Sequence, residues 1–500
     1  MLNTSTPGSG QAIRIVVAAL AITGIILPVE GATVTPRDPR DCLLKAVDGQ
    51  TSQVKFADEA KFQETDVRPY NLNLQYEPFA VTYPRSTNQT AAIVQCAASY
   101  GRKVQARSGG HDYTNKALGG ANGAIVVDMM HLSNVQVNSA GLAQVGSGNK
   151  LKDVAEKLHA ANGRYMPHGS SPTVGIGGHA TVGGLGLNSR LEGTTLDVLK
   201  EAEVVLANGT VVRTSSTEHS DLFWAIRGAG ASFGIVTQFT FQTKPEPKEV
   251  LNFGFTVEST SPASLSASFK AYHQITNDIN LDRRFSAAVV VLKDQLQISG
   301  AFFGPESDFN RMNLEARIPG ITTRTVVAGL NWMEHMNRTF DSIASIFPAQ
   351  SYFAALDTSI TRSTLPSNTS IDNMFQHIQT ADSGSTRWFV LIDLYGGAVG
   401  DVAIDATSLP HRETVYFFTP YAITESPTNQ TTRAFIEKAV LEMQGNEPEK
   451  YLSYAGYTSL PNGFVPQEKY WGPNLVRLQQ IKASVDPNDV FSTPYGVKAA

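Results

Sequence analysis

The segment Arg107-Ser108-Gly109-Gly110-His111-Asp112-Tyr113 decides how the rest of the chain is interpreted. It follows a strand-like run, residues 103–107, with two consecutive glycines. Because glycine has no Cβ, the backbone N–H groups of Gly109 and Gly110 can approach an anionic ligand closely. His111 then places a nucleophilic ring nitrogen at the edge of that anion site. Taken alone, the segment fits an ordinary turn with a surface histidine equally well, so the remaining sequence has to separate the two interpretations.

Composition describes an ordinary globular protein. The chain has 500 residues, of which 42% are hydrophobic and 17% are charged. This length exceeds what one simple core accommodates, so we expect two folding units. The formal net charge is −5 and no basic run occurs, which argues against a nucleic-acid or membrane-surface partner.

The N-terminus has the pattern of a targeting segment. Arg14 precedes an apolar run, residues 15–27, and the small residues Gly31 and Ala32 follow it. A helix needs about 20 apolar residues to cross a bilayer, so this run predicts a signal peptide over residues 1–31. An uncleaved anchor is the alternative interpretation. No second long apolar stretch follows, so no membrane span is expected in the mature protein.

Secretion or entry into the secretory pathway agrees with the cysteines and the glycosylation sequons. Cys42 and Cys96 are the two cysteines of the chain, and an oxidising compartment would pair them. Two cysteines alone cannot build a structural zinc site, and no metal site is predicted. Acceptor sequons for N-glycosylation occur at Asn88, Asn208, Asn337, Asn368 and Asn429.

The first half of the chain alternates strands with short helices. We expect a strand over 125–130, a helix over 151–162 closed by Gly163, and a hairpin turn at Asn208-Gly209. A helix with Asp221 as its N-cap and a strand over 236–243 follow.

A boundary is predicted at residues 244–248, Lys-Pro-Glu-Pro-Lys. Beyond it, strands over 287–292 and 389–394 mix with helices such as 263–272, and a further helix is expected over 470–483. Mixed strands and helices of this kind indicate an α+β fold, with a sheet covered by helices on one face.

Residues 168–193 contain a glycine pattern that imitates a dinucleotide fingerprint. Gly175-Ile-Gly177-Gly178-His179-Ala180 has the required spacing, and Asp197 lies near the position of a ribose contact. No apolar strand precedes it, however, and Gly183, Gly184 and Gly186 oppose a following helix, each by up to ~1 kcal/mol. A backbone-lined groove for an extended ligand is therefore preferred over a Rossmann site. A tightly packed glycine loop without a ligand is the remaining alternative.

Together these segments resemble the berberine bridge enzyme-like FAD-linked oxidases of the vanillyl-alcohol oxidase superfamily. The resemblance rests on residues 107–113, 168–186, 221–235 and 486–491, in this order and spacing. It implies an α+β fold with a two-subdomain PCMH-type FAD-binding module and a substrate domain in which helices cover an antiparallel sheet. The implied parts are 32–75 as the N-terminal part of the FAD module, 76–246 as its PCMH-type domain, 247–450 as the substrate domain, and 451–500 as a segment that returns to the FAD module.

The resemblance also implies how FAD is held. The family links the 8α position of the flavin to the histidine at the position of His111. A second link, to a cysteine, is found in many members, but Ser171 occupies that position here. The flavin is therefore expected to be mono-covalent, while Cys42 and Cys96 match the N-terminal disulfide of the family. Further FAD contacts are expected from Arg107, Ser108, Gly109, Gly110, Asp112, Gly175, Gly178, His179, Gly183, Gly184, Gly234 and Ile235.

Val174 matches a position that gates access to the reactive face of the flavin, where valine accompanies oxygen reactivity in the family. This favours an oxidase over a dehydrogenase, with simple packing as the alternative role of Val174.

The catalytic expectation centres on two tyrosines. Tyr451 and Tyr454 resemble the family's Tyr-x-x-Tyr motif, in which the second tyrosine is the base, and they would share a face only if this turn is helical. A free tyrosine has a pKa of about 10, so a base at neutral pH needs a perturbed setting. Asp393 matches a carboxylate near that tyrosine, and Tyr113 matches a residue beside the flavin.

The sequence departs from the sugar-oxidising members around the substrate. Residues 453–456 read Ser-Tyr-Ala-Gly, and Thr419 replaces a polar residue that contacts substrate. With fewer polar anchors, we predict an oxidase that transfers a hydride from an alcohol, phenol or ring C–H of a natural-product-like small molecule to FAD, with O₂ as re-oxidant giving H₂O₂. The alternatives are an oligosaccharide oxidase acting at the C1 hydroxyl and a flavin-binding scaffold without redox turnover.

Overall fold

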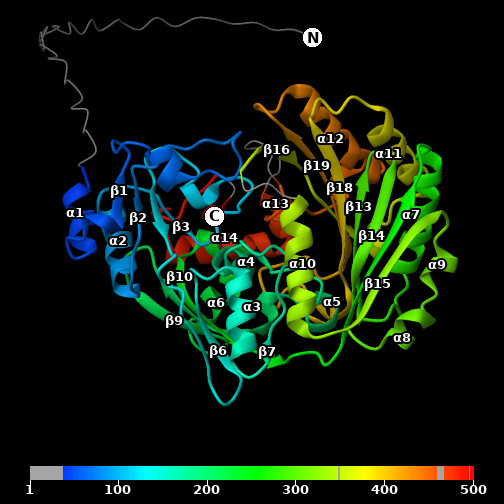
Figure 1. The fold of residues 1–500 in the computed structure, drawn as a ribbon. Helices are drawn as coiled ribbons and strands as arrows, with labels where there is room; N and C mark the ends of the chain where they lie inside the picture. The colour runs from blue at the N-terminus through cyan, green and yellow to red at the C-terminus, as the bar shows by residue number, and fades with distance from the viewer. Residues whose placement is uncertain (1–37, 347–349, 459–466, 495) are drawn as a thin grey trace, which may run out of the picture. The chain divides into compact units, whose positions relative to one another are not determined.

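Sheets of four, five and eight strands organise the protein (Figure 1). The structure is a computed structural model, and it describes residues 38–346, 350–458, 467–494 and 496–500. The predicted signal peptide, residues 1–31, lies outside the described residues.

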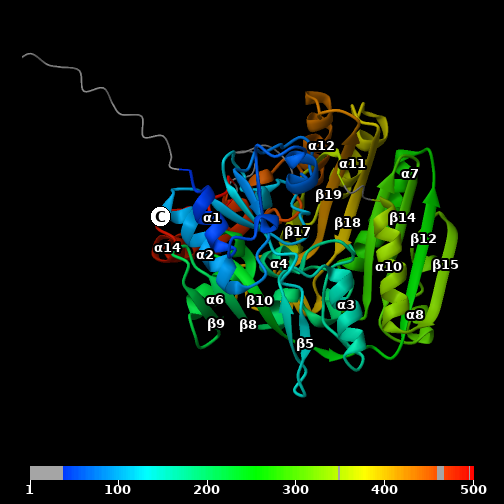
Figure 2. The same cartoon turned by 60° about the vertical axis from the view of Figure 1, so that its left-hand side comes forward.

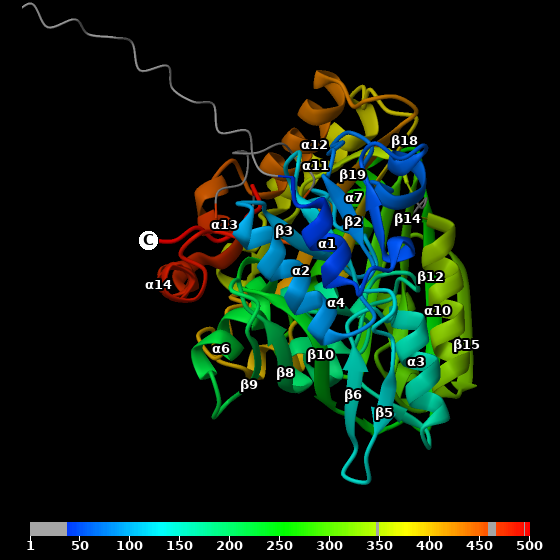
Figure 3. The ribbon, with the colours of Figure 1, turned by 90° about the vertical axis from the view of Figure 1, so that its left-hand side faces the viewer.

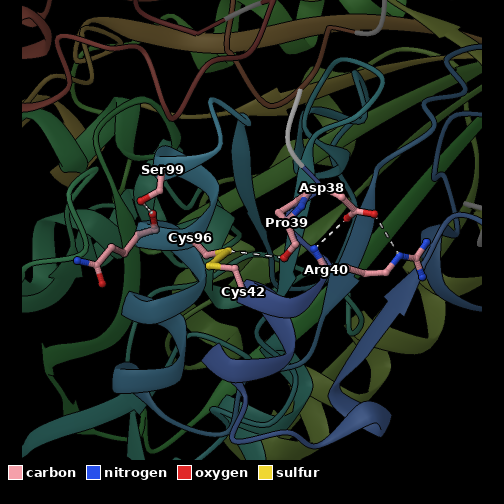
Figure 4. The surroundings of a disulfide bond; sticks show 7 residues. Asp38, Pro39, Arg40, Cys42, Cys96 and Ser99 are labelled. Atoms are coloured by element: carbon pink, nitrogen blue, oxygen red, sulfur yellow. Dashed lines mark hydrogen bonds and ion pairs between the residues drawn. A yellow bond between two sulfur atoms is a disulfide. The ribbon is translucent and has the colours of Figure 1, made fainter. Parts of the chain in front are cut away.

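The four-stranded sheet carries the start of the FAD-binding half. Its order is β1-β2-β4-β3, with β1 antiparallel to β2 and the other pairs parallel. The strands are β1 (Val54–Phe56), β2 (Ala80–Thr82), β3 (Val104–Arg107) and β4 (Ile125–Asp128). Helices α1 (Arg40–Ala46) and α2 (Thr87–Ser99) lie beside this sheet (Figure 3). The disulfide Cys42–Cys96 joins these two helices, with Cα atoms 5.9 Å apart (Figure 4), as the cysteine count predicts.

The five-stranded sheet is antiparallel and has the order β5-β6-β10-β8-β9. Its strands are β5 (Val135–Val137), β6 (Leu142–Gly146), β8 (Leu199–Val205), β9 (Val211–Ser215) and β10 (Ile235–Gln242). Helices α3 (Leu151–Ala160), α4 (Ile176–Val182) and α6 (Ser220–Ala229) accompany it. The predicted hairpin at Asn208-Gly209 joins β8 to β9, where Gly209 has the left-handed φ of +81° that such turns require.

The eight-stranded sheet is antiparallel throughout and forms the second half. Its order is β15-β12-β14-β13-β18-β19-β16, and β17 also pairs with β19. The strands are β12 (Val250–Glu258), β13 (Phe285–Leu292), β14 (Gln295–Phe302), β15 (Ile321–Leu330), β16 (Tyr352–Ala355), β17 (Thr358–Thr361), β18 (Arg387–Leu394) and β19 (Thr414–Thr424). This matches the antiparallel sheet that the family resemblance implies.

Helices on the two faces of this sheet have different roles. The outer face is covered by α7 (Pro262–Thr276), α11 (Asn368–Thr380) and α12 (Gln430–Met443), whose apolar side chains join the core (Figure 2). On the opposite face, α10 (Trp332–Ile346) packs near β12 and α3 (Figure 2). The inner face of the sheet is therefore turned toward the FAD-binding half.

The C-terminal segment returns to the first half of the chain. After α13 (Gln467–Trp471), helix α14 (Leu475–Val485) lies beside α6 (Figure 1). The buried Lys482 ammonium contacts the Asp486 carboxylate at 2.6 Å and donates to the Ser232 carbonyl at 2.8 Å. The Val104 N–H of β3 donates to the Val490 carbonyl at 3.0 Å. Residues 38–500 form one compact unit, so the boundaries at 246 and 450 stay sequence-based predictions.

Two local predictions were wrong. Asp221 is not an N-cap: α6 begins at Ser220, and the Asp221 carboxylate forms an exposed ion pair with Arg477. A helix does follow Gly175, although the glycines seemed to oppose it. Helix α4 has only seven residues, buries Ile176 and Ala180 one turn apart, and ends where Gly183 begins, so the unfavourable glycines lie outside it.

Candidate active site

A cavity of about 440 Å³ lies between the FAD-binding half and the inner face of the eight-stranded sheet. Its wall includes His111, Ser171 and Val174 from the first half and Asp393 from β18. Segments distant in sequence therefore meet here, and the volume is within the usual range for a small-molecule site. Six of the predicted site residues line the cavity: His111, Tyr113, Ser171, Val174, His179 and Asp393.

The turn that carries His111 is held by buried polar contacts. Arg107 forms an ion pair with Asp128 at 2.7 Å and donates to the Val67 carbonyl at 2.6 Å, which anchors the end of β3. Asp112 accepts hydrogen bonds from the Thr114 and Lys116 backbone N–H groups at 3.0 and 3.1 Å, which folds the chain back after the turn. Arg107 and Asp112 thus shape the turn from behind and do not line the cavity.

Close backbone approach explains the glycines of this turn. A Cβ on Gly109 would lie 2.2 Å from the Gly175 nitrogen, and a Cβ on Gly175 would lie 2.0 Å from the Gly109 nitrogen. Gly110 has the left-handed φ of +72°. Ser108 bridges the same two segments: its hydroxyl donates to the Ser147 carbonyl at 2.5 Å and accepts from the Gly177 N–H at 3.3 Å.

The imidazole of His111 contacts residues on two sides. Its Nε2 is 2.9 Å from the Thr173 Oγ1, and its ring lies on the Tyr70 ring with the centroids 4.6 Å apart. Burial, with a contribution from nearby Lys150, lowers the pKa of His111 to about 4. The imidazole is therefore neutral at physiological pH, which is the state in which a ring nitrogen can act as a nucleophile.

Aromatic rings dominate the cavity wall beyond His111. Tyr113 is stacked on Tyr70 at 5.9 Å, and its hydroxyl is 3.1 Å from the Tyr421 hydroxyl. Tyr421 in turn stacks on Phe389, with the centroids 4.7 Å apart. Tyr457 lines the cavity next to Tyr113 at a centroid distance of 6.3 Å. These faces suit a flat, unsaturated ligand.

Asp393 is the carboxylate of the cavity wall. It lies on β18, paired in register with Ala288 of β13 and Phe417 of β19. Burial raises its pKa to about 7 and also places its charge near Tyr457, whose pKa is raised by burial and then by Asp393. A carboxyl group with this pKa can accept a proton near neutral pH.

Comparison with known proteins assigns the chain to a family. Residues 78–215 match the family model for an FAD-binding domain, and residues 453–498 match the model described as berberine and berberine like. The FAD-linked oxidoreductase sorD of Penicillium rubens is 35% identical over 461 residues, which cover 90% of this chain and 96% of that protein. The chain is a berberine bridge enzyme-like FAD-linked oxidoreductase.

Other relatives of this oxidoreductase carry carbohydrate names. Chitooligosaccharide oxidase of Gibberella zeae is 30% identical over 473 residues, which cover 91% of this chain and 94% of that protein. A solved structure of glucooligosaccharide oxidase from Acremonium strictum superposes with a TM-score of 0.84 at 28% identity, covering 93% of this chain and all of that one. Its title describes a 6-S-cysteinyl, 8α-N1-histidyl FAD. The fold of the present oxidoreductase is that of the PCMH-type FAD-linked oxidases.

The residues of this oxidoreductase fit an FAD in the cavity. His111 presents an unprotonated imidazole at the wall, and Tyr70 and Tyr113 offer ring faces. A Cβ built on Gly178 meets nothing within 4 Å, so the backbone there borders open space. When bound, the flavin supplies the hydride-accepting chemistry, while the protein provides the anchor, the orientation and the proton acceptor.

Several predicted FAD contacts of the oxidoreductase lie behind the cavity. Gly184 packs against Thr195, and a Cβ on Gly183 would lie 2.6 Å from the Tyr454 hydroxyl oxygen. Gly234 packs against Val204, and Ile235 is buried in β10 opposite Val205. His179 lines the cavity and accepts a hydrogen bond from the Gly169 N–H at 2.9 Å through Nε2, and burial lowers its pKa to about 3.

The two tyrosines of the Tyr-x-x-Tyr motif do not share a face. The segment is irregular, and the Tyr451 hydroxyl donates to the Thr364 carbonyl at 3.2 Å, away from the cavity wall. The Tyr454 hydroxyl accepts from the Gly184 N–H at 3.3 Å, and burial raises its pKa. Tyr454 stands behind Tyr457, with ring centroids 5.1 Å apart.

The sequence reasoning missed four residues around the cavity: Tyr70, Thr173, Asp357 and Tyr457. Tyr457 lies in the tyrosine run that was already singled out, so its three-residue spacing from Tyr454 was an available signal. Asp357 accepts hydrogen bonds from the Tyr454 N–H and the Thr458 hydroxyl, both at 2.6 Å. No local pattern indicates Asp357 or Tyr70, because each acts on a segment far away in sequence.

Proposed function

We propose that this FAD-linked oxidoreductase is a secreted oxidase that takes a hydride from an alcohol, phenol or ring C–H of a small aromatic or unsaturated molecule. The cavity between His111 and Asp393 carries the proposal, because it places a flavin anchor and a proton acceptor on opposite walls of one enclosed space. O₂ would re-oxidise the flavin and give H₂O₂, in keeping with valine at position 174 in the wall.

The FAD would be linked covalently to His111 alone. The neutral imidazole at the cavity wall supports this link, and Ser171, also at the wall, cannot form the thioether that a cysteine forms. Acid precipitation should leave the flavin with the protein, and mass spectrometry of proteolytic peptides should find it on the peptide with His111. In a His111→Ala variant the flavin should be released into the supernatant. Flavin that stays bound after this substitution would refute the assignment.

Removal of the substrate proton has two candidates, Asp393 and Tyr454. The family motif favours Tyr454, whose hydroxyl oxygen receives a hydrogen bond from the Gly184 N–H that would stabilise a phenolate. Asp393 faces the cavity itself and has its pKa raised by burial to about 7. A general base is most effective when its pKa lies near the working pH, so we favour Asp393 as the group that contacts the substrate.

The aromatic wall favours an apolar, planar substrate over a sugar. Tyr70, Tyr113, Phe389, Tyr421 and Tyr457 provide ring faces, whereas Thr419 is fully buried in β19 and cannot contact a substrate. An oligosaccharide oxidised at C1 is the second candidate. It is favoured by the polar side chains on the sheet and on α10, namely Asn252, Ser286, Ser299, Thr325 and Arg338, and by the names of several relatives.

Anaerobic reduction of the flavin separates these substrates. Bleaching of the 450-nm region by benzylic or allylic alcohols and phenols, with no reaction of reducing oligosaccharides, is the expected result. The reverse pattern would replace the substrate class and keep the oxidase. If no compound of a broad panel reduces the flavin, a flavin-binding scaffold without turnover becomes the better description.

Secretion and glycosylation also belong to this proposal. The asparagines of all five sequons are exposed, at positions 88, 208, 337, 368 and 429, and the disulfide joins α1 to α2. Among the described residues, none of the helices combines the length and the apolar character needed to span a bilayer. A mobility shift on treatment with a glycosidase, and recovery of the protein from the culture medium, would test both parts.

A further inference from the structure

The imidazole of His111 is oriented before any flavin is attached to it. Tyr70 lies against one face of the ring, and Nε2 is 2.9 Å from the Thr173 Oγ1. No residue that the structure describes makes a hydrogen bond to Nδ1. Of the two ring nitrogens, Nδ1 is therefore the one left free to form a bond.

Thr173 itself is held by the backbone on both sides. The Leu151 N–H donates to the Val174 carbonyl and the Ile176 N–H donates to the Asn149 carbonyl, each at 2.9 Å. The Thr173 carbonyl faces Gly109, where a Cβ would approach it to 2.7 Å. The hydroxyl of Thr173 is thus presented to His111 by a segment that is fixed against the same turn.

The direction of the hydrogen bond decides whether Nδ1 can react. A neutral imidazole carries one proton, and the nitrogen without it has the lone pair. If Nε2–H donates to the hydroxyl oxygen, Nδ1 keeps its lone pair and is nucleophilic. If the hydroxyl donates to Nε2 instead, Nδ1 carries the proton and is blocked.

We propose that Thr173 is the positioning residue for flavin attachment: it accepts a hydrogen bond from Nε2–H of His111 and thereby leaves the lone pair on Nδ1. This inference rests on the proposed covalent link at His111. It assigns Nδ1 as the attachment atom and gives the exposed hydroxyl of Thr173 a role that ends in a measurable covalent bond.

A hydroxyl suits both sides of this reaction. Attachment breaks one C–H bond of the flavin 8α-methyl group and the N–H bond at Nε2, and it forms one C–N bond at Nδ1. The two electrons released pass to dioxygen, which leaves as H₂O₂ with the two protons. Nε2 then has a lone pair and no proton, and the Thr173 hydroxyl can turn round and donate to it. Valine, of similar shape, can do neither.

The experiment compares Thr173→Val with Thr173→Ser by the rate at which flavin becomes covalently bound. Each protein is produced under riboflavin limitation and FAD is then added in air. Acid-precipitated samples are taken over time, and their flavin fluorescence is measured after gel electrophoresis. We expect Thr173→Val to attach flavin about tenfold more slowly, the effect of losing one hydrogen bond, and Thr173→Ser to stay near the wild-type rate.

The controls separate this inference from the proposed function. Thr217→Val removes an exposed hydroxyl contact to Ser215, away from the cavity, and should attach flavin at the wild-type rate. If Thr173→Val attaches flavin as fast as the wild type, or faster, while His111→Ala attaches none, the role of Thr173 is refuted and the link at His111 stands. If Thr173→Val and Thr173→Ser are equally slow, the hydroxyl is not the cause and the proposal also fails. If His111→Ala still attaches flavin, the proposed link itself is wrong.

Discussion

Two aspartates of this oxidoreductase have the same raised pKa but opposite surroundings. Burial raises the pKa of both Asp357 and Asp393 to about 7. Asp357 lies in the turn between β16 and β17, with 1% of its surface exposed, and its two oxygens accept hydrogen bonds from the Tyr454 N–H and the Thr458 hydroxyl. Asp393 lies on β18 and lines the cavity.

The difference shows that a raised pKa does not by itself identify a catalytic carboxylate. The oxygens of Asp357 are occupied by the protein, and their work is to hold the irregular segment that carries Tyr454 and Tyr457. Burial is the cause of the shift at Asp393, and the cavity leaves room for a ligand beside it. We therefore expect substitutions at Asp393 to change the reaction and substitutions at Asp357 to change stability.

The largest effect is expected from Asp393→Asn. If Asp393 accepts the substrate proton, this isosteric change should slow anaerobic flavin reduction by about 10²–10⁴-fold, the usual contribution of a general base. The rate is measured by stopped-flow absorbance with a substrate found in the panel. Unchanged covalent flavin in the same preparation is the control for folding. A loss smaller than about threefold would remove Asp393 from the reaction.

The pH dependence of that rate tests the same distinction. A base must be unprotonated, so flavin reduction by the wild type should rise with pH and level off above about 7, the pKa of Asp393. Asp357→Asn should keep this rise, because its carboxylate does not contact the substrate. A rise that disappears in Asp357→Asn and persists in Asp393→Asn would reverse the two roles.

The tyrosines sharpen the comparison at a smaller scale. Tyr457 lines the cavity near Asp393, and Tyr454 stands behind it. We expect Tyr457→Phe to lower the rate of flavin reduction about tenfold, the effect of one lost polar contact, and Tyr454→Phe to lower it less. A loss of two or more orders of magnitude in Tyr454→Phe alone would restore the family motif's base and place Asp393 in support.

The smallest effect is expected in the stability of Asp357→Asn. The folded-state pKa of Asp357 is raised from the model value of 3.8 to about 7, so its protonated form is favoured by folding. That contribution is fully present below about pH 4 and is lost as the pH rises through about 7. The melting temperature of Asp357→Asn relative to the wild type should therefore increase by a few degrees between pH 5 and pH 8. Asp341→Asn, which changes an exposed carboxylate, should leave the difference constant.

Local patterns predicted the elements that depend on neighbouring residues. The amphipathic spacing of residues 151–160, the Asn208-Gly209 turn and the alternating strand at 235–242 all appear where the sequence indicates them. The two wrong predictions concern helix ends, Asp221 and Gly175, where one residue or one short turn depends on tertiary contacts. The catalytic side was harder because Tyr454 and Tyr457 both fit the tyrosine pattern, and only packing decides which of them reaches the cavity.

By itself the sequence determined the flavin-binding half: the glycine-histidine turn at 107–113, the serine at 171 and the tyrosine run at 451–457 carry their meaning in short stretches of adjacent residues. Only the tertiary structure decided what surrounds them. It brought Thr173 and Tyr70 to the imidazole of His111, put Asp393 in the cavity wall, and left Asp357 behind it. The physical reason is that a carboxylate or an imidazole acts through what it touches, and in this fold those contacts join residues tens to hundreds of positions apart.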